Sequence, residues 1–440
     1  MAQVTPGDRP YDSGGALRYA RGPTVKILYV SQYFPPEMGA PAARVSELSR
    51  AWAAEGHEVC VLTGFPNHPT GVIPPEYRGK LRQRERWGAV EVLRTWVYAT
   101  ANRGIAKRSL AFASWAVSSV VLGALDRGVR EADVVIATSP QFLCAVGGFV
   151  LSRILHVPYV LEIRDLWPQS IVEVGALPAR HPIVLVLEQI ERFLYREADL
   201  LVSVTDSFCE VWRQQGIDPG KMRVIKNGVD LQLFEPGPKG NEHRERLGLQ
   251  GKFVVAYIGT HGMAQRLDTL LDAAVLLRDD PEIHVLLVGE GAERERLVAR
   301  VREQGLTNVT MLGQQPREAI PGLVAASDLV AVILRRAELF QKVIPSKMFE
   351  VMGSARPMVL GVQGEAEALL RAAGSGWVVP PEDPRALADA IRGAKADPEE
   401  CRRRGEAGRA YVREHYDRDV LARRYLDDLR ELLASRSHGE

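Results

Sequence analysis

Short apolar segments alternate with helix-like segments along almost the whole chain. Residues 25–31 and 158–163 are nearly continuously apolar, and stretches typical of helices, such as 41–56 and 142–155, separate such runs. A strand that is apolar on both faces is typical of a parallel sheet covered by helices on both sides. The alternation therefore predicts an α/β protein with doubly wound parallel sheets.

This alternation runs twice, and a polar segment, EPGPKGNE at 235–242, separates the two halves. At roughly 150 residues per domain, 440 residues fit two large domains with terminal extensions. The expected division is a loose N-terminal tail at 1–23, a first domain at 24–236, a linker at 237–244, a second domain at 245–400 and a C-terminal helical segment at 401–440.

Charge and cysteine usage exclude several classes of protein. Lys and Arg number 56 against 55 Asp and Glu, so the chain lacks the basic excess of a nucleic-acid-binding protein. Its four cysteines are far apart, which predicts reduced thiols in a cytoplasmic protein without a disulfide framework or zinc site. The first 23 residues lack the apolar core of a signal peptide, and no apolar run reaches 18 residues.

The loop after the first strand does not fit a nicotinamide-binding protein. That function needs G-x-G-x-x-G, whereas residues 31–44 read SQYFPPEMGAPAAR with Gly39 alone. Gly39 and Ala40 can instead present backbone groups to a sugar or phosphate at the start of the next helix. An ordinary strand-to-helix connection is the alternative. Arg44, one turn inside the helix, faces either the cleft or solvent.

A second polar cluster follows the strand at 158–163. Arg164, Asp165 and Trp167 stand at its carboxyl end, where an open parallel sheet binds its ligands. Trp167, followed by a proline, can form an aromatic platform for a sugar or another hydrophobic group. The alternative is a surface salt bridge between Arg164 and Asp165. We favour a functional cluster.

Glycine-rich loops end three strands of the second half. Amide groups at such strand ends, where helices begin, are suited to anions, and three loops at one sheet edge indicate a nucleotide diphosphate, although any turn uses glycine. The candidate donor-binding residues are Gly259, His261, Gly262, Gln265, Gly289, Glu290, Gly291 and Gly313, with Arg266 beside them.

The fourth cluster lies at 342–357. Pro345-Ser346 predicts a helix start, which places Ser346 and Lys347 where a phosphate can bind. Glu350 lies three residues further on the same helix face and can accept hydrogen bonds from ribose hydroxyls, while Lys342 is a further candidate. A solvated Lys–Glu pair on an exposed helix face is the alternative.

With these residues the chain resembles the retaining, nucleotide-sugar-dependent glycosyltransferases of family 4, and within it transferases of bacterial surface polysaccharides such as those likened to N-acetyl-L-fucosamine transferases. The resemblance covers residues 26–433. It rests on YFPPEMG at 33–39, GHEV at 56–59, RDLWP at 164–168, NGVD at 227–230, GEG at 289–291 and PSKMFE at 345–350.

The resemblance implies a GT-B fold, in which two Rossmann-like domains face each other across a cleft and C-terminal helices pack back towards the first domain. It also implies transfer from a nucleotide diphosphate, with uridine favoured, and retention of configuration. No metal or other cofactor is expected. The implied catalytic residues are Lys347, Arg266, Asp165 and Arg164, with Glu350 at the ribose and the acceptor near Gly39, Ala40, Arg44 and Trp167.

Four positions depart from the family pattern. Lys342 stands where many relatives have a glutamate, and Thr260 and Gln265 stand where many have an arginine and a lysine for the diphosphate. Arg164 stands where many have a histidine. The roles of those four family residues are therefore not carried over, and Lys347 and Arg266 are expected to supply the missing positive charge.

Basic residues from Lys80 to Arg108 flank the apolar segment 110–125, which favours peripheral contact with an anionic membrane at its inner face if the acceptor is lipid-linked. A buried helix with solvated basic neighbours is the alternative. Two other functions also fit the fold: a sugar-nucleotide epimerase, which needs no acceptor, and a non-catalytic module that binds nucleotide sugars.

Overall fold

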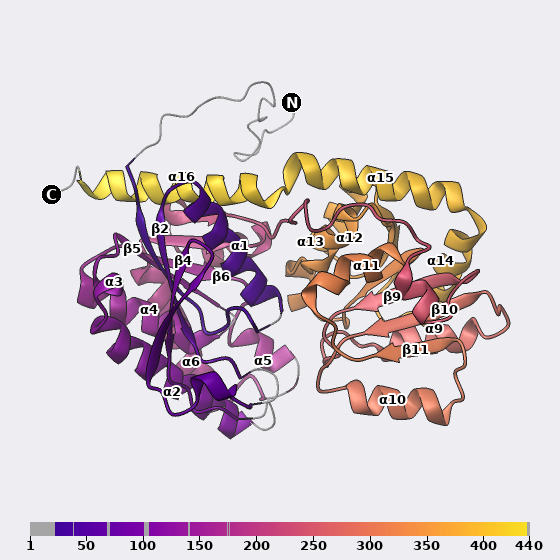
Figure 1. Cartoon of the computed structure of the whole chain (residues 1–440), viewed down its shortest axis with the longest axis horizontal. Coiled ribbons are helices and arrows are strands. Elements are labelled where there is room, and N and C mark those ends of the chain that lie inside the picture. The colour runs from indigo at the N-terminus through magenta and orange to yellow at the C-terminus, as the bar shows by residue number, and fades with distance from the viewer. Residues whose placement is uncertain are drawn as a thin grey trace.

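The computed structural model describes residues 23–437 apart from 38, 68–70, 101–104, 140, 174 and 176. It contains two α/β domains side by side, spanned by the two C-terminal helices (Figure 1). The expected tail lies outside the described residues, except for Pro23.

The first domain is built on a largely parallel sheet. In the described residues its strand order is β3-β4-β2-β1-β5-β6-β7-β8, and β3 alone is antiparallel, to β4. The strands are β1 (Lys26–Val30), β2 (Glu58–Gly64), β3 (Arg82–Trp87), β4 (Val90–Thr95), β5 (Val134–Thr138), β6 (Tyr159–Ile163), β7 (Leu200–Ser203) and β8 (Met222–Val224). The sequence did not predict β3, because its RQRERW pattern is polar and lies at an exposed sheet edge.

Helices cover both faces of this sheet, as the apolar strands require. One face packs against α1 and the C-terminal helix, and the other packs mainly against α2, α4 and α6. The helices of the domain are α1 (Ala40–Ala54), α2 (Ile105–Ala124), α3 (Arg127–Arg130), α4 (Phe142–Leu155), α5 (Gln169–Glu173), α6 (Pro182–Glu197) and α7 (Asp206–Gln214).

The second domain has a parallel sheet with the order β11-β10-β9-β12-β13-β14 among the described residues. Its strands are β9 (Phe253–Ile258), β10 (Ile283–Val288), β11 (Val309–Leu312), β12 (Leu329–Ile333), β13 (Met358–Gly361) and β14 (Gly376–Val378). Its helices are α8 (Glu242–Arg246), α9 (Asp268–Leu276), α10 (Arg294–Glu303), α11 (Ile320–Ala325), α12 (Lys347–Gly353), α13 (Glu365–Ala373) and α14 (Pro384–Ala396). The predicted pair of doubly wound domains is confirmed.

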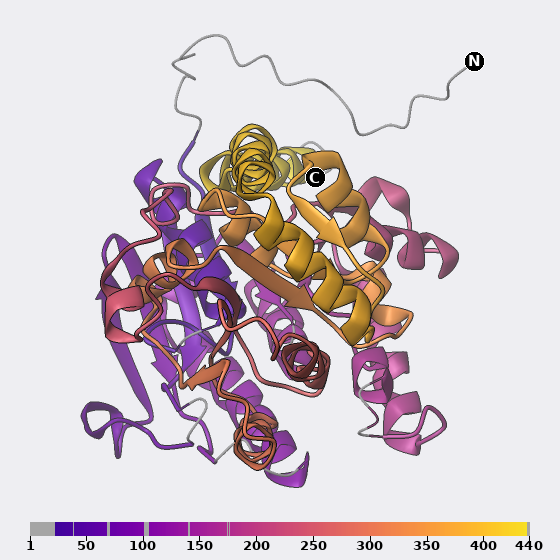
Figure 2. The same ribbon diagram turned by 90° about the vertical axis from the view of Figure 1, so that its right-hand side faces the viewer.

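The two C-terminal helices divide between the domains. Helix α15 (Pro398–His415) packs on the second domain, and α16 (Arg418–Ser437) returns along the first (Figures 1 and 2). Tyr425 and Leu426 of α16 are fully buried in the cluster that contains Trp52 of α1. The expectation that C-terminal helices pack back towards the first domain is confirmed.

The chain crosses between the domains earlier than the predicted linker at 237–244. Val229 and Phe234 are fully buried in the core of the second domain. At Gly228 an added Cβ would lie 2.5 Å from the carbonyl oxygen of Tyr416. The segment that enters the second domain at Gly228 and the segment that returns to the first domain at Tyr416 are therefore in close contact. The polar stretch at 235–242 is a surface segment of the second domain that leads into α8.

Candidate functional site

Two glycine loops of the second domain, after β9 and after β10, interlock at the carboxyl ends of these strands. The N–H of His261 donates to Glu290 O at 2.8 Å, and the N–H of Glu293 donates to His261 O at 2.9 Å. Gly289 has a φ of 145°, and a Cβ there would lie 1.9 Å from Gly259 O. Packing between backbones therefore requires a glycine at 289, independently of any ligand.

The predicted residues of these loops are brought together by short local contacts. Gln265 Oε1 accepts the N–H of Gly262 at 3.2 Å, and a Cβ on Gly313 would lie 3.1 Å from Glu290 Oε1. Arg266 also follows this loop, but its side chain is exposed and has no ion-pair partner among the described residues. Its predicted role in catalysis stays a prediction.

His261 is fully buried at the centre of these loops. Neither Nδ1 nor Nε2 of its ring has a hydrogen-bond partner in the described part of the chain. Burial, helped by the charges of Arg294 and Lys347, lowers the pKa of His261 to about 4. The ring is therefore neutral at physiological pH, and a neutral imidazole can both donate and accept a hydrogen bond.

Lys347 begins α12 and reaches the same loops. Its Nζ lies 3.8 Å from the centroid of the Tyr257 ring, and a Cβ on Gly259 would come within 2.6 Å of it. Among the described residues Lys347 has no ion-pair partner, and burial lowers its pKa to about 7 although Glu350 opposes the shift. A desolvated ammonium without a counter-ion beside a glycine loop is suited to bind a phosphate.

Glu350 follows one turn after Lys347 on the same helix, as predicted. Burial raises the pKa of its carboxyl, and the positive charge of Arg317 limits that rise. Arg317 Nη1 lies 3.4 Å from Glu350 Oε1, and Nη2 lies 2.8 Å from Glu47 Oε1 on α1 of the first domain. Arg317 was not predicted from the sequence, because a lone arginine in a polar loop has the pattern of any solvated residue.

Lys342 is not part of this cluster of charges. It lies in a short 3₁₀ helix, Leu339–Lys342, and its Nζ pairs with Glu338 at 3.1 Å. Its predicted contact with the donor has no support in the geometry. This i,i+4 pair is similar to the solvated i,i+3 Lys–Glu pair that is the alternative for Lys347 and Glu350.

Arg44 does not face solvent, which corrects one of the two orientations expected for it. It is buried, and its guanidinium pairs with Glu162 Oε2 at 2.8 Å and donates to Ile225 O at 3.0 Å. Burial alone would raise the pKa of Glu162, but the charge of Arg44 holds it below its ordinary value. Arg44 therefore joins α1 to β6. Because these partners already use most of its N–H groups, few N–H groups remain to bind an acceptor.

Arg164 and Asp165 lie at the carboxyl end of β6 and form no surface salt bridge. Arg164 is only 8% exposed, and its Nε and Nη1 have no hydrogen-bond partner among the described residues. Asp165 lines a cavity together with Leu161 and Ile163 of β6. Burial raises its pKa to about 6. The surface-pair alternative is therefore wrong.

Asp165 and Trp167 line a small apolar cavity between the sheet, α4 and α6. Its volume of about 10 Å³ leaves room for about one water molecule. Glu191 also lines the cavity, and its carboxylate accepts a hydrogen bond from Tyr195 Oη at 2.6 Å. Burial raises the pKa of Glu191 to about 7. Trp167 packs partly against the core, so only part of its ring is available as a platform.

Gly39 and Ala40 form the N-terminus of α1 at the same sheet edge. Gly39, with a φ of 128°, is the N-cap residue, and no side chain caps the helix. The first turn contains no acidic residue. Its free N–H groups and the positive end of the helix dipole therefore face the carboxyl edge of the sheet, where an anion would be stabilised.

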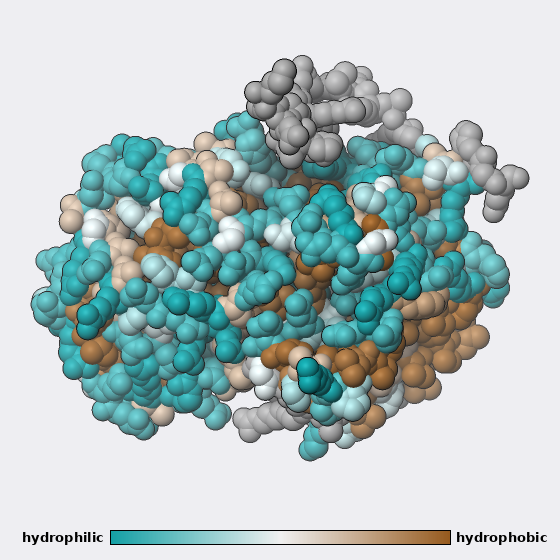
Figure 3. All heavy atoms as spheres, turned by 180° about the vertical axis from the view of Figure 1, so that it is seen from behind, coloured by the Kyte–Doolittle hydropathy of each residue, from teal (hydrophilic) through white to brown (hydrophobic). Residues whose placement is uncertain are grey.

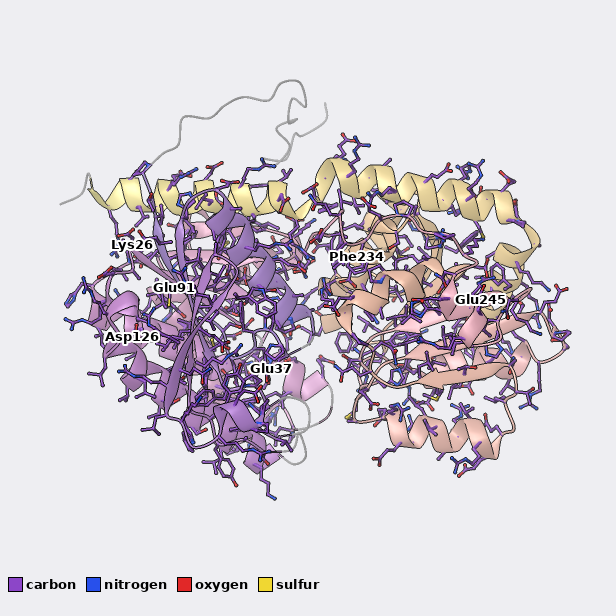
Figure 4. All side chains as sticks on the ribbon, in the orientation of Figure 1. Lys26, Glu37, Glu91, Asp126, Phe234 and Glu245 are labelled. Carbon is purple, nitrogen blue, oxygen red and sulfur yellow. The ribbon has the colours of Figure 1, made fainter. Side chains whose placement is uncertain are left out.

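Direct polar contacts hold the two domains together near this region. The carboxylate of Glu365, at the start of α13, accepts the backbone N–H of Asp206 at 3.0 Å and that of Ser207 at 2.9 Å, at the start of α7. Phe234, labelled in Figure 4, lies on the second-domain side of the junction, with the Arg317 guanidinium 5.6 Å from its ring centroid.

Two facing doubly wound domains, with unpaired cations and glycine loops at the carboxyl ends of their strands, define a protein of the GT-B glycosyltransferase class. The glycosyl transferase 4-like domain model matches residues 39–228, and the glycosyl transferases group 1 model matches 239–411. The chain therefore carries both domains of this family and is a glycosyltransferase.

Named relatives agree with this assignment. The chain is 25% identical over 414 residues to the colanic acid biosynthesis glycosyl transferase WcaI of Escherichia coli, covering 92% of this chain and 100% of the relative. Sucrose-phosphate synthase from Thermosynechococcus elongatus shares its fold with a TM-score of 0.73 at 21% identity, over 93% of this chain and 99% of that chain.

A third relative was solved with ligands. HepE of Anabaena, in complex with UDP and glucose, superposes with a TM-score of 0.67 at 21% identity, over 92% of this chain and 99% of that chain. In the described part of the chain, no group of three His, Cys, Asp or Glu side chains could hold a metal ion, and no helix is both long and apolar enough to cross a membrane.

Proposed function

We propose that this glycosyltransferase moves a sugar from a UDP-linked donor to a saccharide acceptor that is lipid-linked, with retention of configuration, in the synthesis of a bacterial surface polysaccharide. The observation that carries the proposal is Lys347, a half-buried lysine beside the Gly259 loop that has no ion-pair partner among the described residues. The similarity to WcaI, named for colanic acid biosynthesis, and to HepE, solved with UDP, supports the class of donor and product.

In the proposed reaction, the bond between the sugar and the diphosphate breaks while positive charge develops on the sugar, an acceptor hydroxyl oxygen forms the new bond to the sugar, and the hydroxyl proton passes to the leaving diphosphate. Lys347 and the amides of the Gly259–Gly262 segment stabilise the negative charge that builds on the leaving diphosphate. Glu350 accepts hydrogen bonds from the ribose hydroxyls. The buried, neutral His261 can contact the sugar, and closure of the domains excludes water, which suppresses hydrolysis.

The proposal places the protein in the cytoplasm, at the inner face of the membrane, where a lipid-linked acceptor would lie. An apolar face on α2, α4 and α6 supports this placement, and Figure 3 shows apolar surface gathered on the first domain, seen from behind. Its exposed side chains include Leu110, Val117 and Val121 of α2, Leu125 directly after that helix, Val150 and Ile154 of α4, and Ile183, Leu185, Val186 and Phe193 of α6.

The donor site is tested with Lys347→Ala and Glu350→Gln. Loss of Lys347 should lower turnover by on the order of a hundredfold, as when one oxyanion donor is removed. Glu350→Gln weakens a charge-assisted hydrogen bond and should lower donor affinity by about 1.5–3 kcal/mol. Transfer rate, donor affinity and melting temperature are measured for both variants.

If both variants remain folded and transfer sugar at the parental rate, this donor site is wrong. Product analysis adds a second discrimination. An epimerase would convert the donor without acceptor, and a binding module would never release UDP from it. The donors to test first are UDP-hexoses and UDP-N-acetylhexosamines, because of the resemblance to N-acetyl-L-fucosamine transferases.

A further inference from the structure

Tyr257 of β9 contacts both parts of the predicted donor site. Its side chain is fully buried, and Lys347 Nζ lies 3.8 Å from the centroid of its ring. Its hydroxyl donates a hydrogen bond to Thr260 O at 2.8 Å, in the loop that follows the strand. This one side chain therefore connects the start of α12 to the loop after β9.

The ring attracts the Lys347 ammonium without neutralising it. The face of an aromatic ring carries partial negative charge, and its attraction for a cation is strongest where water is excluded. A carboxylate in the same place would form an ion pair that a diphosphate would have to displace. The ring instead leaves the N–H groups of the ammonium that point away from it available for a ligand.

The backbone of Gly259 is the second surface against which this ammonium lies. A Cβ at Gly259 would lie 2.6 Å from Lys347 Nζ and 3.7 Å from Tyr257 Oη. A side chain at position 259 would therefore displace the ammonium from the ring. The glycine keeps Lys347 in contact with both the ring and the loop.

We propose that Tyr257 is a positioning residue of the donor site, whose ring holds the Lys347 ammonium against the Gly259 loop while its hydroxyl fixes that loop at Thr260. The ammonium and the amide groups of the loop then meet the same diphosphate. This inference deepens the proposed function and rests on it. Burial raises the pKa of the Tyr257 phenol, so the hydroxyl stays a neutral donor at the pH where enzymes work.

The other charges around Lys347 come from three elements and the loop. Burial lowers the pKa of Lys347 to about 7, and Glu350 of α12 opposes this shift. Arg317 pairs with Glu350. Burial, followed by the charges of Arg294 on α10 and of Lys347, lowers the pKa of His261 in the loop after β9. Loss of the ring would leave these groups in place and remove an attraction that favours the charged ammonium, so the pKa of Lys347 should fall further.

The first experiment measures the pKa of Lys347 in the full chain without donor, by NMR titration of protein with lysine labelled at Cε. Loss of one resonance in Lys347→Arg provides the assignment. Tyr257→Met removes the ring and should lower the pKa of Lys347 by about one pH unit. Tyr257→Phe keeps the ring and should leave that pKa within about 0.3 pH units of the parental value.

Tyr159→Met is the matched control. Tyr159 of β6 is also fully buried, and its hydroxyl donates to a backbone carbonyl, Ala145 O, at 2.7 Å. This control should lower the melting temperature as Tyr257→Met does and leave the pKa of Lys347 unchanged. Tyr257→Leu is a second ring-free variant for the case that Tyr257→Met does not fold. An unchanged pKa without the ring, or an equal fall in Tyr257→Phe, would overturn the proposal.

The second experiment measures the affinity for UDP-glucose between pH 6 and pH 9. Tyr257→Phe should bind the donor about three- to tenfold more weakly than the parent at every pH, because the loop loses one hydrogen bond. The affinity of Tyr257→Met relative to Tyr257→Phe should fall by a further factor of about five from pH 6 to pH 9. A ratio that is constant with pH would contradict a role through the charge of Lys347.

The two experiments separate this inference from the proposed function. The NMR titration needs no donor, so it tests the contact between Tyr257 and Lys347 even if the parent does not bind UDP-glucose. Absence of UDP-glucose binding by the parent would count against the proposed donor.

Discussion

At the scale of single residues, the charge of Lys347 depends on pH in the range where enzymes work. Burial lowers its pKa to about 7 in the empty protein, and a bound diphosphate favours the charged form. Above pH 7 the empty protein must take up a proton to bind the donor. Donor affinity should therefore fall by up to about tenfold per pH unit as the pH rises above 7, until the pH reaches the pKa of Lys347 in the complex.

This prediction is checked by titrating UDP-glucose between pH 6 and pH 9. Lys347→Arg is the matched variant, because an arginine stays charged throughout this range. Its donor affinity should be nearly constant with pH even if it is lower overall. A parental affinity that does not change between pH 7 and pH 9 would show that Lys347 carries its charge in the empty protein or does not contact the donor.

Replacement of Gly289 by alanine should destabilise the protein. An alanine there needs an unfavourable φ of 145° and places its Cβ 1.9 Å from Gly259 O. Gly289→Ala should lower the free energy of unfolding by about 2–4 kcal/mol. Gly305→Ala, at a φ of 58° with no atom within 4 Å, should lose only about 1 kcal/mol. Urea unfolding of both variants tests this, and equal losses would contradict the interlocked loops.

At the scale of elements, Arg317 connects α1 of the first domain to α12 of the second through Glu47 and Glu350. Arg317→Gln removes the positive charge that limits the rise in the pKa of Glu350. Glu350 should then be protonated to a higher pH, and a protonated carboxyl accepts fewer hydrogen bonds from ribose. Donor affinity should fall by about three- to tenfold, and its loss towards acid pH should begin at a higher pH than in the parent.

The measurement is donor affinity from pH 5 to pH 8 for the parent, Arg317→Gln and Arg50→Gln. The last variant removes an arginine of α1 that pairs with Asp230 at 2.8 Å and does not contact Glu350. It should match the parent. If Arg317→Gln also matches the parent in affinity and pH dependence, then Arg317 is only one more contact between the domains.

At the scale of the whole molecule, the apolar face on α2, α4 and α6 predicts binding to anionic membranes. Contiguous apolar surface of this kind marks an interaction site more often than chance exposure. Val117→Asp combined with Val121→Asp should lower the fraction of protein that co-sediments with anionic vesicles by at least about tenfold. Val420→Asp, at an exposed position of α16, is the matched control and should bind like the parent.

Background co-sedimentation of the parent protein on anionic vesicles would remove the membrane proposal altogether. Equal binding of the double variant and the parent would instead move the contact to another surface. Circular dichroism of each variant provides the folding control, because both valines are more than half exposed and their replacement should not disturb the core.

The α/β class and the presence of two doubly wound halves could be predicted from the sequence, because buried parallel strands must be apolar along their whole length. Ligands gather at the carboxyl ends of such strands, so candidate residues there could also be named from the sequence. Ser346, Lys347 and Glu350 were predicted in this way, because a proline and a serine before a short apolar helix mark its start; their contact with a donor stays a prediction.

Which charged side chains are paired and which are not depends on the tertiary structure. Arg44 and Glu162 are 118 residues apart, and Arg317 and Glu47 are 270 residues apart. The crossing at Gly228 likewise depends on a returning segment 188 residues further on, at Tyr416. The partner of a charged side chain cannot be predicted from neighbouring residues in the sequence, because the packing of sheets and helices determines which groups meet. The sequence therefore identified Arg164 as a candidate residue, and the fold shows that its Nε and Nη1 lack a hydrogen-bond partner among the described residues.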